Sequence, residues 1–237
     1  MYAQRISAVP ARAEYSGRSL YQEPGQQARG QVTAVGAPQK VSPGKTLFAE
    51  GDEAENVFEV ARGMLRLCKL LADGRRQITG FLTAGHILGL ADQDAYLYTA
   101  EAITEVTVYR YSRTRFERML DEVPGFAKRL LGMTSNELCA AQDQMLLLGR
   151  KSATEKLASF LLLLAKRQDD DDCNRIQVPM TRADIADYLG LTVETVSRNF
   201  TRLRQEEIIA LRSTSCVEVL DRDQLEELAA NQFSDDF

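Results

Sequence analysis

The pattern of apolar and polar residues divides the chain into an aperiodic leading segment, a strand-rich segment and a helical segment. Residues 1–40 are rich in Gly, Gln, Ala and Ser without a sustained period, which is typical of a flexible arm. From Lys45 to Arg113, short β-prone runs alternate with glycines, and the run Asn56–Val60 alternates apolar and polar side chains. We expect a small antiparallel barrel or sandwich over residues 41–122.

One turn of this strand-rich segment is predicted from its composition. Asp73-Gly74 stands between two β-prone runs. In the two-residue hairpin turns that favour Asp-Gly, both central residues take positive φ. We therefore predict a tight hairpin turn with Asp73 and Gly74 at its centre.

A helical stretch is predicted from about Arg115 to Gly149, with an interruption at Pro124. Its second part, within residues 123–150, carries a stripe of apolar and small residues at alternating spacings of four and three. This is the a/d pattern of a coiled coil, and a helix lying on its own β domain is the alternative. Because the stripe is sustained to Leu148, we favour a partner helix, and a second copy of the chain is the simplest partner. The predicted dimer interface consists of Ala127, Leu131, Thr134, Leu138, Ala141, Met145 and Leu148.

Residues 181–205 have the pattern of two short helices joined by a tight turn. Thr181 and Asp184 have the spacing of a capping box, and Gly190 can take the left-handed conformation that ends a helix. Thr192 can cap a second helix that begins at Val193. Within a C-terminal domain of residues 151–237, this arrangement predicts a helix-turn-helix. The runs 208–212 and 216–220 are expected to form a two-stranded wing behind it.

The second helix of this pair has two distinct faces. Val196, Phe200 and Leu203 share one face and can pack inward, whereas polar side chains share the opposite face. Arg can bind guanine with two hydrogen bonds, Glu can accept from cytosine, and Ser can bond either way. We expect the bases of double-stranded DNA to be read by Glu194, Ser197, Arg198 and Val193. We expect the DNA backbone to be contacted by Thr181, Thr192, Thr195, Thr201 and Arg202.

An ordinary helical hairpin with a solvated polar face is the alternative to this DNA-reading face. The two caps, the glycine turn and an arginine-rich continuation favour the helix-turn-helix. The net charge of −5 argues mildly against DNA binding, because phosphates attract Lys and Arg. The local charge is different, since four arginines lie between Arg198 and Arg212, and the acidic excess includes Asp169–Asp172 and the tail. We interpret the acidic run around residues 168–174 as a solvated loop.

Composition narrows the classes of function that remain. The 237 residues suffice for two domains, and neither a membrane-spanning run nor a signal-peptide core is present, so a cytoplasmic protein is expected. A single histidine and the lack of a Gly-x-Ser-x-Gly or phosphate-loop motif disfavour an enzyme, and no catalytic residue is proposed. No metal site is expected, because the cysteines are scattered, and we interpret them as free thiols, with the thiol in the acidic loop the most exposed. They are Cys68, Cys139, Cys173 and Cys216.

Residues 184–198 closely resemble the CRP/FNR family of regulators, and the resemblance covers most of residues 41–225. FNR-type members share the pattern Glu-x-x-Ser-Arg, here from Glu194 to Arg198, and Val193 stands where the cyclic-AMP receptor type has Arg. Residues 145–151 resemble the end of the dimer helix in FixK-type proteins. Within the family, the chain therefore resembles the FNR/FixK branch.

This resemblance implies an α+β fold with an N-terminal antiparallel β-roll like that of cyclic-nucleotide-binding proteins, a long dimerisation helix and a C-terminal winged helix-turn-helix. It implies a homodimer that binds a palindrome similar to TTGAT-N4-ATCAA and recruits RNA polymerase. FixK-type kinship implies activation of genes for low-oxygen respiration or nitrogen fixation.

Two departures from the family bear on cofactors. Cyclic-nucleotide binders have Gly-Glu and then Arg-Ser or Arg-Thr, whereas this chain has Gly89-Leu90 and Tyr98-Thr99. Arg110 and Arg113 lie beyond the loop and are expected to be poorly placed as replacements, so no cyclic nucleotide is predicted. FNR carries an iron–sulfur cluster on N-terminal cysteines, and residues 1–67 contain no cysteine, so no cluster is predicted.

The alternative function is a sensor of the same family whose β-roll holds an effector or haem. His86 is the only histidine and could be an axial ligand of haem. We prefer to interpret it as a turn residue that follows Gly85.

Overall fold

The computed structural model describes residues 36–90, 94–167 and 174–230 of the chain. The flexible arm expected over residues 1–40 falls mostly outside this description. Its last residues are different from the expectation, because strand β1 (Ala37–Val41) pairs with β8 (Val106–Ser112) from Ala37 onward. The β domain therefore begins before residue 41. Only Val41 of this strand is buried, so the strand has too few apolar residues to show an alternating pattern.

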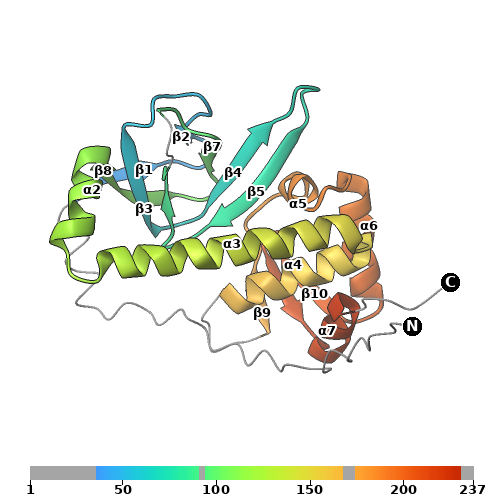
Figure 1. The fold of residues 1–237 in the computed structure, drawn as a ribbon. Helices are drawn as coiled ribbons and strands as arrows, with labels where there is room; N and C mark the ends of the chain where they lie inside the picture. Colours follow the sequence, from blue (N-terminus) through green and yellow to red (C-terminus); the bar gives the residue numbers. More distant parts are fainter. Residues whose placement is uncertain (1–35, 91–93, 168–173, 231–237) are drawn as a thin grey trace, which may run out of the picture. The chain divides into compact units, whose positions relative to one another are not determined.

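The N-terminal domain consists of two antiparallel four-stranded sheets, as the sequence predicted (Figure 1). One sheet has the order β1-β8-β3-β6 and the other has the order β2-β7-β4-β5. The remaining strands are β2 (Thr46–Phe48), β3 (Asn56–Arg62), β4 (Leu65–Leu70), β5 (Arg76–Leu82), β6 (Ile87–Leu88) and β7 (Thr99–Ala102). A shared core that includes Phe48, Phe58, Leu65 and Val106 belongs to strands of both sheets. Burial of this apolar surface is the main force that holds the sheets together.

Strand β3 is buried more completely than its sequence indicates. Val57, Phe58, Glu59 and Val60 are all buried, although alternation predicts one face toward water. Glu59 is tolerated inside because its carboxylate accepts hydrogen bonds from the Tyr111 hydroxyl at 3.2 Å and from Arg129 at 2.9 Å. The alternating pattern predicts the strand correctly, but it does not reveal that Glu59 on the polar face is buried.

The hairpin between β4 and β5 turns differently from the prediction. Gly74 has φ +83°, but Asp73 does not have positive φ. The N–H of Leu71 donates to the carbonyl of Arg75 at 2.8 Å, and the N–H of Gly74 donates to that of Leu71 at 2.9 Å. The loop therefore holds three residues, with glycine at its left-handed position. The expected two-residue turn with both residues at positive φ was wrong.

Two helices follow the β domain. Helix α2 (Arg113–Glu122) begins at the N-cap Ser112 and ends before Pro124, as expected for a residue that disfavours helix on its N-terminal side. Helix α3 (Phe126–Arg150) has Gly125, at φ +78°, as its N-cap. The interruption predicted at Pro124 is confirmed, and α3 is long and uninterrupted (Figure 1).

The C-terminal domain combines helices with a small antiparallel sheet. Its elements are α4 (Ala153–Arg167), β9 (Arg175–Gln177), α5 (Arg182–Leu189), α6 (Val193–Gln205), β10 (Ile209–Ser213), β11 (Cys216–Val219) and α7 (Arg222–Ala230). The sheet has the order β10-β11-β9, so the predicted wing pairs as expected and β9 adds a third strand. Sequence reasoning predicted neither β9 nor α7.

The core of the C-terminal domain continues onto the β4–β5 hairpin. Met64, Cys68, Ile78 and Phe81 join the same apolar cluster as the buried residues of α4 and α5. The ring centroid of Phe81 lies 5.1 Å from that of Tyr188. In the part of the chain that the structure describes, no helix is both long and apolar enough to cross a membrane.

Candidate nucleic-acid interface

Helix α5 begins and ends as its sequence predicts. The Thr181 hydroxyl accepts from the N–H of Asp184 at 3.1 Å, and the Asp184 carboxylate accepts from the N–H of Thr181 at 3.0 Å. This reciprocal pair is a complete capping box. Gly190 takes the left-handed conformation at φ 62° and ends the helix. The first helix of the predicted helix-turn-helix is therefore fixed by local signals.

Helix α6 packs on the rest of the domain through one face. Val196, Phe200 and Leu203 are all buried, as predicted. The N-cap Thr192 accepts from the N–H of Thr195 at 3.2 Å. Arg182 of α5 places its guanidinium carbon 3.2 Å from the centroid of the Phe200 ring, and burial lowers the pKa of Arg182 to about 10. This cation–π contact ties α6 to α5, and sequence reasoning missed it.

The opposite face of α6 carries the four residues expected to read bases. Val193, Glu194, Ser197 and Arg198 are all exposed. Hydrogen bonds from its own backbone N–H and from the Thr192 hydroxyl, helped by the charge of Arg198, hold the pKa of Glu194 below its ordinary value. Glu194 is therefore a carboxylate that only accepts hydrogen bonds. The Ser197 hydroxyl donates to the Val193 carbonyl at 2.8 Å and keeps its acceptor capacity.

The five residues expected to contact the DNA backbone already have partners within the chain. The hydroxyl of Thr181 caps α5, and those of Thr192 and Thr195 lie 3.0 Å apart at the start of α6. The Thr201 hydroxyl donates to the Ser197 carbonyl at 3.0 Å. Arg202 donates from Nε to Glu206 at 2.8 Å, but both side chains are exposed. Exposed pairs of this kind contribute little, so the guanidinium of Arg202 can exchange its partner for a phosphate at small cost.

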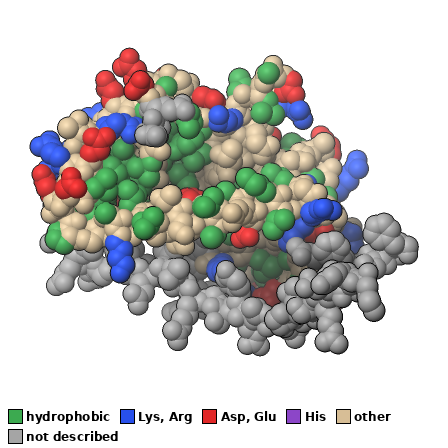
Figure 2. All heavy atoms as spheres, in the orientation of Figure 1, with side chains coloured by type: hydrophobic (Ala, Val, Ile, Leu, Met, Phe, Trp, Pro, Cys, Tyr) green, Lys and Arg blue, Asp and Glu red, His purple; other side chains and the backbone are tan. Residues whose placement is uncertain are grey.

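The stripe predicted on α3 is exposed. Leu131, Leu138 and Met145 show 71%, 61% and 71% of their surface, and hydrophobic side chains lie along this helix in Figure 2. The face of α3 that packs on the same chain is shifted by one residue, and includes the buried Phe126 and Leu147. Six of these seven residues are exposed on the single chain and Leu148 is half-buried, so α3 does not bury this stripe on its own β domain. An exposed apolar stripe of this length is unusual on the surface of a monomeric protein and indicates an interaction site.

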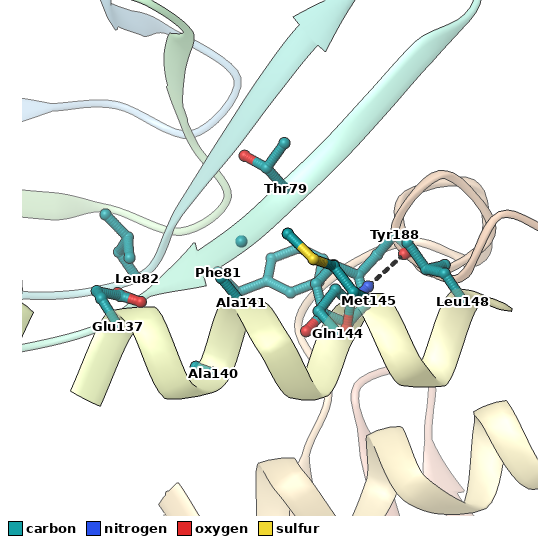
Figure 3. A pocket seen from close by; sticks show the side chains of 11 residues that line it. Thr79, Phe81, Leu82, Glu137, Ala140, Ala141, Gln144, Met145, Leu148 and Tyr188 are labelled. Atoms are coloured by element: carbon teal, nitrogen blue, oxygen red, sulfur yellow. Dashed lines mark hydrogen bonds between the residues drawn. The ribbon is translucent and has the colours of Figure 1, made fainter. Parts of the chain in front are cut away.

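A cleft lies between β5, α3 and α5 (Figure 3). It has a volume of about 240 Å³ and is lined mainly by apolar side chains. Ala141, Met145 and Leu148 of the stripe form part of its wall. The amide of Gln144 donates to the carbonyl of Tyr188 at 2.9 Å beside it. This hydrogen bond links α3 directly to α5.

The loop that corresponds to the ligand site of cyclic-nucleotide binders is held by hydrogen bonds within the chain. The N–H of Gly89 donates to the Tyr98 hydroxyl at 3.3 Å, and burial raises the pKa of Tyr98. Arg113 reaches this loop, although it follows it in the sequence. Its guanidinium donates to the carbonyls of Gly89 at 3.1 Å and Ala54 at 2.8 Å. Arg110 is exposed on β8.

The remaining candidates for cofactor or redox chemistry are single residues. His86 is the last residue of a turn, in which the N–H of His86 donates a hydrogen bond to the Thr83 carbonyl. The Nδ1 of His86 lies 2.9 Å from the same carbonyl oxygen. Cys68 is buried, Cys216 is half-buried and Cys139 is exposed, whereas Cys173 lies outside the described residues. Within the described ranges, no three His, Cys, Asp or Glu side chains gather in a way that could hold a metal ion.

Comparison with known proteins matches each domain to a family model. Residues 38–123 match the cyclic nucleotide-binding domain, and residues 155–228 match the Crp-like helix-turn-helix domain. The chain is 43% identical over 193 residues to the transcriptional activatory protein AadR of Rhodopseudomonas palustris, covering 81% of this chain and 80% of AadR. It is 43% identical over 191 residues to the nitrogen fixation regulation protein FixK of Bradyrhizobium diazoefficiens, covering 80% of each. The solved structure of FixK2 from Bradyrhizobium japonicum is similar with a TM-score of 0.77 and 36% identity, covering 84% of this chain and 100% of that one.

Proposed function

Because the chain belongs to the CRP/FNR family of transcriptional regulators, we propose that it is an FNR/FixK-type activator that reads a palindrome similar to TTGAT-N4-ATCAA. Members of this family are DNA-binding regulators and not enzymes, as the sequence predicted. The name of AadR supports a role in activation, and that of FixK supports target genes for nitrogen fixation. Low-oxygen respiration is the related target class that the FixK-type resemblance implies.

The observation that carries this proposal is the exposed face of α6. Each TTGAT half-site contains a single G·C pair. Arg can bind the guanine with two hydrogen bonds, and a carboxylate can accept from the amino group of the paired cytosine. Arg198 and Glu194 lie four residues apart on one helix face, and both are exposed, so together they suit this one base pair. Ser197 and Val193 beside them suit the neighbouring A·T pairs, Val193 by apolar contact with a thymine methyl.

Replacement of Arg198 by Ala tests the base-reading role. Binding is measured at one salt concentration to the palindrome, to a palindrome with both G·C pairs changed to A·T, and to a scrambled duplex. We expect Arg198→Ala to lose about 1–3 kcal/mol on the palindrome. On the changed palindrome the variant and the wild type should bind alike, because the contact is already absent. Equal weakening on all three duplexes would contradict the assigned role of Arg198.

We propose that the active form is a homodimer held by the stripe on α3. The exposure of Leu131, Leu138 and Met145 supports this, because a partner helix would remove these side chains from water. A palindromic target also requires two copies of the reading helix. RNA polymerase is the partner through which such a dimer activates, and the cytoplasm is where it meets both DNA and polymerase.

We also propose that the β domain works without a cyclic nucleotide and that the chain carries no iron–sulfur cluster. The residues present do not fit a cyclic phosphate, since Tyr98 replaces the family's Arg and its hydroxyl already occupies the N–H of Gly89. Arg113 reaches this loop, but its guanidinium donates to the carbonyls of Ala54 and Gly89. The single turn residue His86 does not favour the haem alternative. The cluster is disfavoured because residues 1–67 contain no cysteine.

A further inference from the structure

Two arginines of the β4–β5 hairpin bind two carboxylates of α5. Arg66 donates from Nη1 to Asp184 Oδ1 at 2.8 Å, and Arg76 donates from Nη2 to the same oxygen at 2.8 Å. Arg76 also donates from Nε to Asp187 Oδ2 at 2.8 Å, while Arg66 binds Glu101 of β7 at 2.7 Å. We call these five residues the hairpin–α5 charge cluster. It joins the two arginines of the hairpin to carboxylates of α5 that lie 108 to 118 residues away in the sequence.

Asp184 has two functions in this cluster. Its side chain is only 2% exposed, so an unpaired charge there would be costly. Oδ2 accepts from the backbone N–H and the hydroxyl of Thr181, which completes the cap of α5. Oδ1 accepts from both arginines. The residue that starts the first helix of the helix-turn-helix is thus the residue that holds this helix on the β domain.

Three further contacts fix the direction of α5. Gln77 of β5 donates to the carbonyl of Asp187 at 2.6 Å, and Gln144 of α3 donates to that of Tyr188 at 2.9 Å (Figure 3). The Tyr188 ring packs against Phe81 of β5. Since bonds to the last turn of α5 come from both β5 and α3, rotation of this helix about the hairpin would break several contacts at once.

The orientation of α6 is coupled to that of α5. The two helices are joined by the short turn at Gly190 and by the contact between Arg182 and Phe200. In a dimer that reads a palindrome, the two reading helices must lie about one turn of DNA apart, roughly 34 Å. The hairpin–α5 charge cluster fixes each reading helix relative to α3, and α3 carries the proposed dimer axis.

We propose that Arg66 and Arg76 are positioning residues that set the half-site spacing at which the dimer binds DNA. The proposal rests on the proposed function, because spacing has meaning only for a dimer on a palindrome. A cluster that only stabilises the fold would weaken binding to every duplex equally. A cluster that positions α6 must instead affect the preference for one spacing over another.

The test compares Arg76→Gln with Arg75→Gln. Arg75 lies on the same hairpin, is 78% exposed and pairs with Asp73 of its own turn, so it controls for the loss of one positive charge. Binding is measured to TTGAT-N4-ATCAA, to the same half-sites separated by N5, and to a single half-site. We expect Arg76→Gln to bind the N4 duplex about tenfold more weakly and to change binding to the others by less than about twofold. Arg75→Gln should keep the wild-type preference.

Asp187→Asn provides a second variant that leaves the cap of α5 intact. It removes one of the two α5 carboxylates that bind Arg76, and it should also reduce the preference for N4. In a double variant with Arg76→Gln the loss should not be the sum of the two single losses. Wild-type spacing preference in both single variants overturns the proposal, as does an equal loss in Arg75→Gln. A wild-type chain that binds palindrome and scrambled duplex alike would instead overturn the proposed function, and this inference with it.

Discussion

Arg198 and Arg202 lie one turn apart on α6 but are expected to affect DNA binding in different ways. Arg202 is exposed and pairs with Glu206 at 2.8 Å. Because this pair contributes little, Arg202 can bind a phosphate, which carries no sequence information. We expect Arg202→Gln to weaken binding to the palindrome and to a scrambled duplex by a similar factor. The slope of log K against log salt should fall by about 1.

The matched control for Arg202 is Arg222 of α7. Arg222 pairs with Glu226 at the same distance of 2.8 Å and is 49% exposed against 57% for Arg202. Arg222→Gln removes one charge and one i,i+4 pair but lies outside the reading helix. We expect it to leave the salt slope unchanged. A slope that falls equally in both variants would mean that general charge, and not a contact at Arg202, governs binding.

At the scale of elements, α3 has an exposed apolar stripe and, one residue away around the helix, a face that packs on its own chain. Leu138 is 61% exposed and lies in the stripe, whereas Leu146 is 57% exposed and lies outside it. We expect Leu138→Glu to place a charge in the dimer interface and to shift the protein toward monomers, with loss of palindrome binding. Leu146→Glu should leave both properties unchanged. Sedimentation at several protein concentrations measures the first and a binding titration the second.

A monomeric wild-type chain would contradict this prediction, as would a Leu146→Glu variant that dissociates as much as Leu138→Glu. Leu146→Glu is a matched control, because Leu138 and Leu146 have the same size and nearly the same exposure. Only their position on the helix differs, so a difference in assembly reports the stripe itself.

The elements that sequence predicted well are those whose signals are local. Thr181, Asp184 and Gly190 fix the ends of α5 within a few residues of each other, so the helix-turn-helix could be placed without knowledge of the fold. Strand β9 has three residues and exists because Ile176 pairs with Val217, which no local pattern reveals. Helix α7 did have a local signal in Asp221, a favoured N-cap residue directly before the helix. Its carboxylate accepts from the N–H of Gln224 at 2.9 Å.

Contacts between distant segments could not be predicted in this way. Nothing in the sequence around Arg66 or Asp184 indicates that the two side chains are partners. Only the fold brings Arg66 Nη1 within 2.8 Å of Asp184 Oδ1. Glu59 illustrates the same limit, because its burial depends on Tyr111 and Arg129 rather than on its own strand. The candidate base-reading face is visible in the sequence, but the cluster that orients it is not.

At the scale of the whole molecule, the proposed form needs no effector to bind DNA. A ligand present at about 100 times its Kd stabilises the folded state by about 2.7 kcal/mol, which raises the unfolding temperature by several degrees. We expect millimolar cyclic AMP or cyclic GMP to change neither the unfolding temperature nor the affinity for the palindrome. The reason lies at Gly89, whose N–H already donates to the Tyr98 hydroxyl.

A variant with Leu90→Glu and Tyr98→Arg tests this reason as well as the outcome. It restores the Gly-Glu and Arg-Thr pairs that cyclic-nucleotide binders carry, since Thr99 is already present. It also frees the N–H of Gly89, and Arg supplies a cation for the phosphate. We expect this variant to show a nucleotide-dependent rise in unfolding temperature that the wild type does not show. A wild-type chain that responds to either nucleotide would contradict the proposal, because the β domain would then act as a sensor that controls the reading helix.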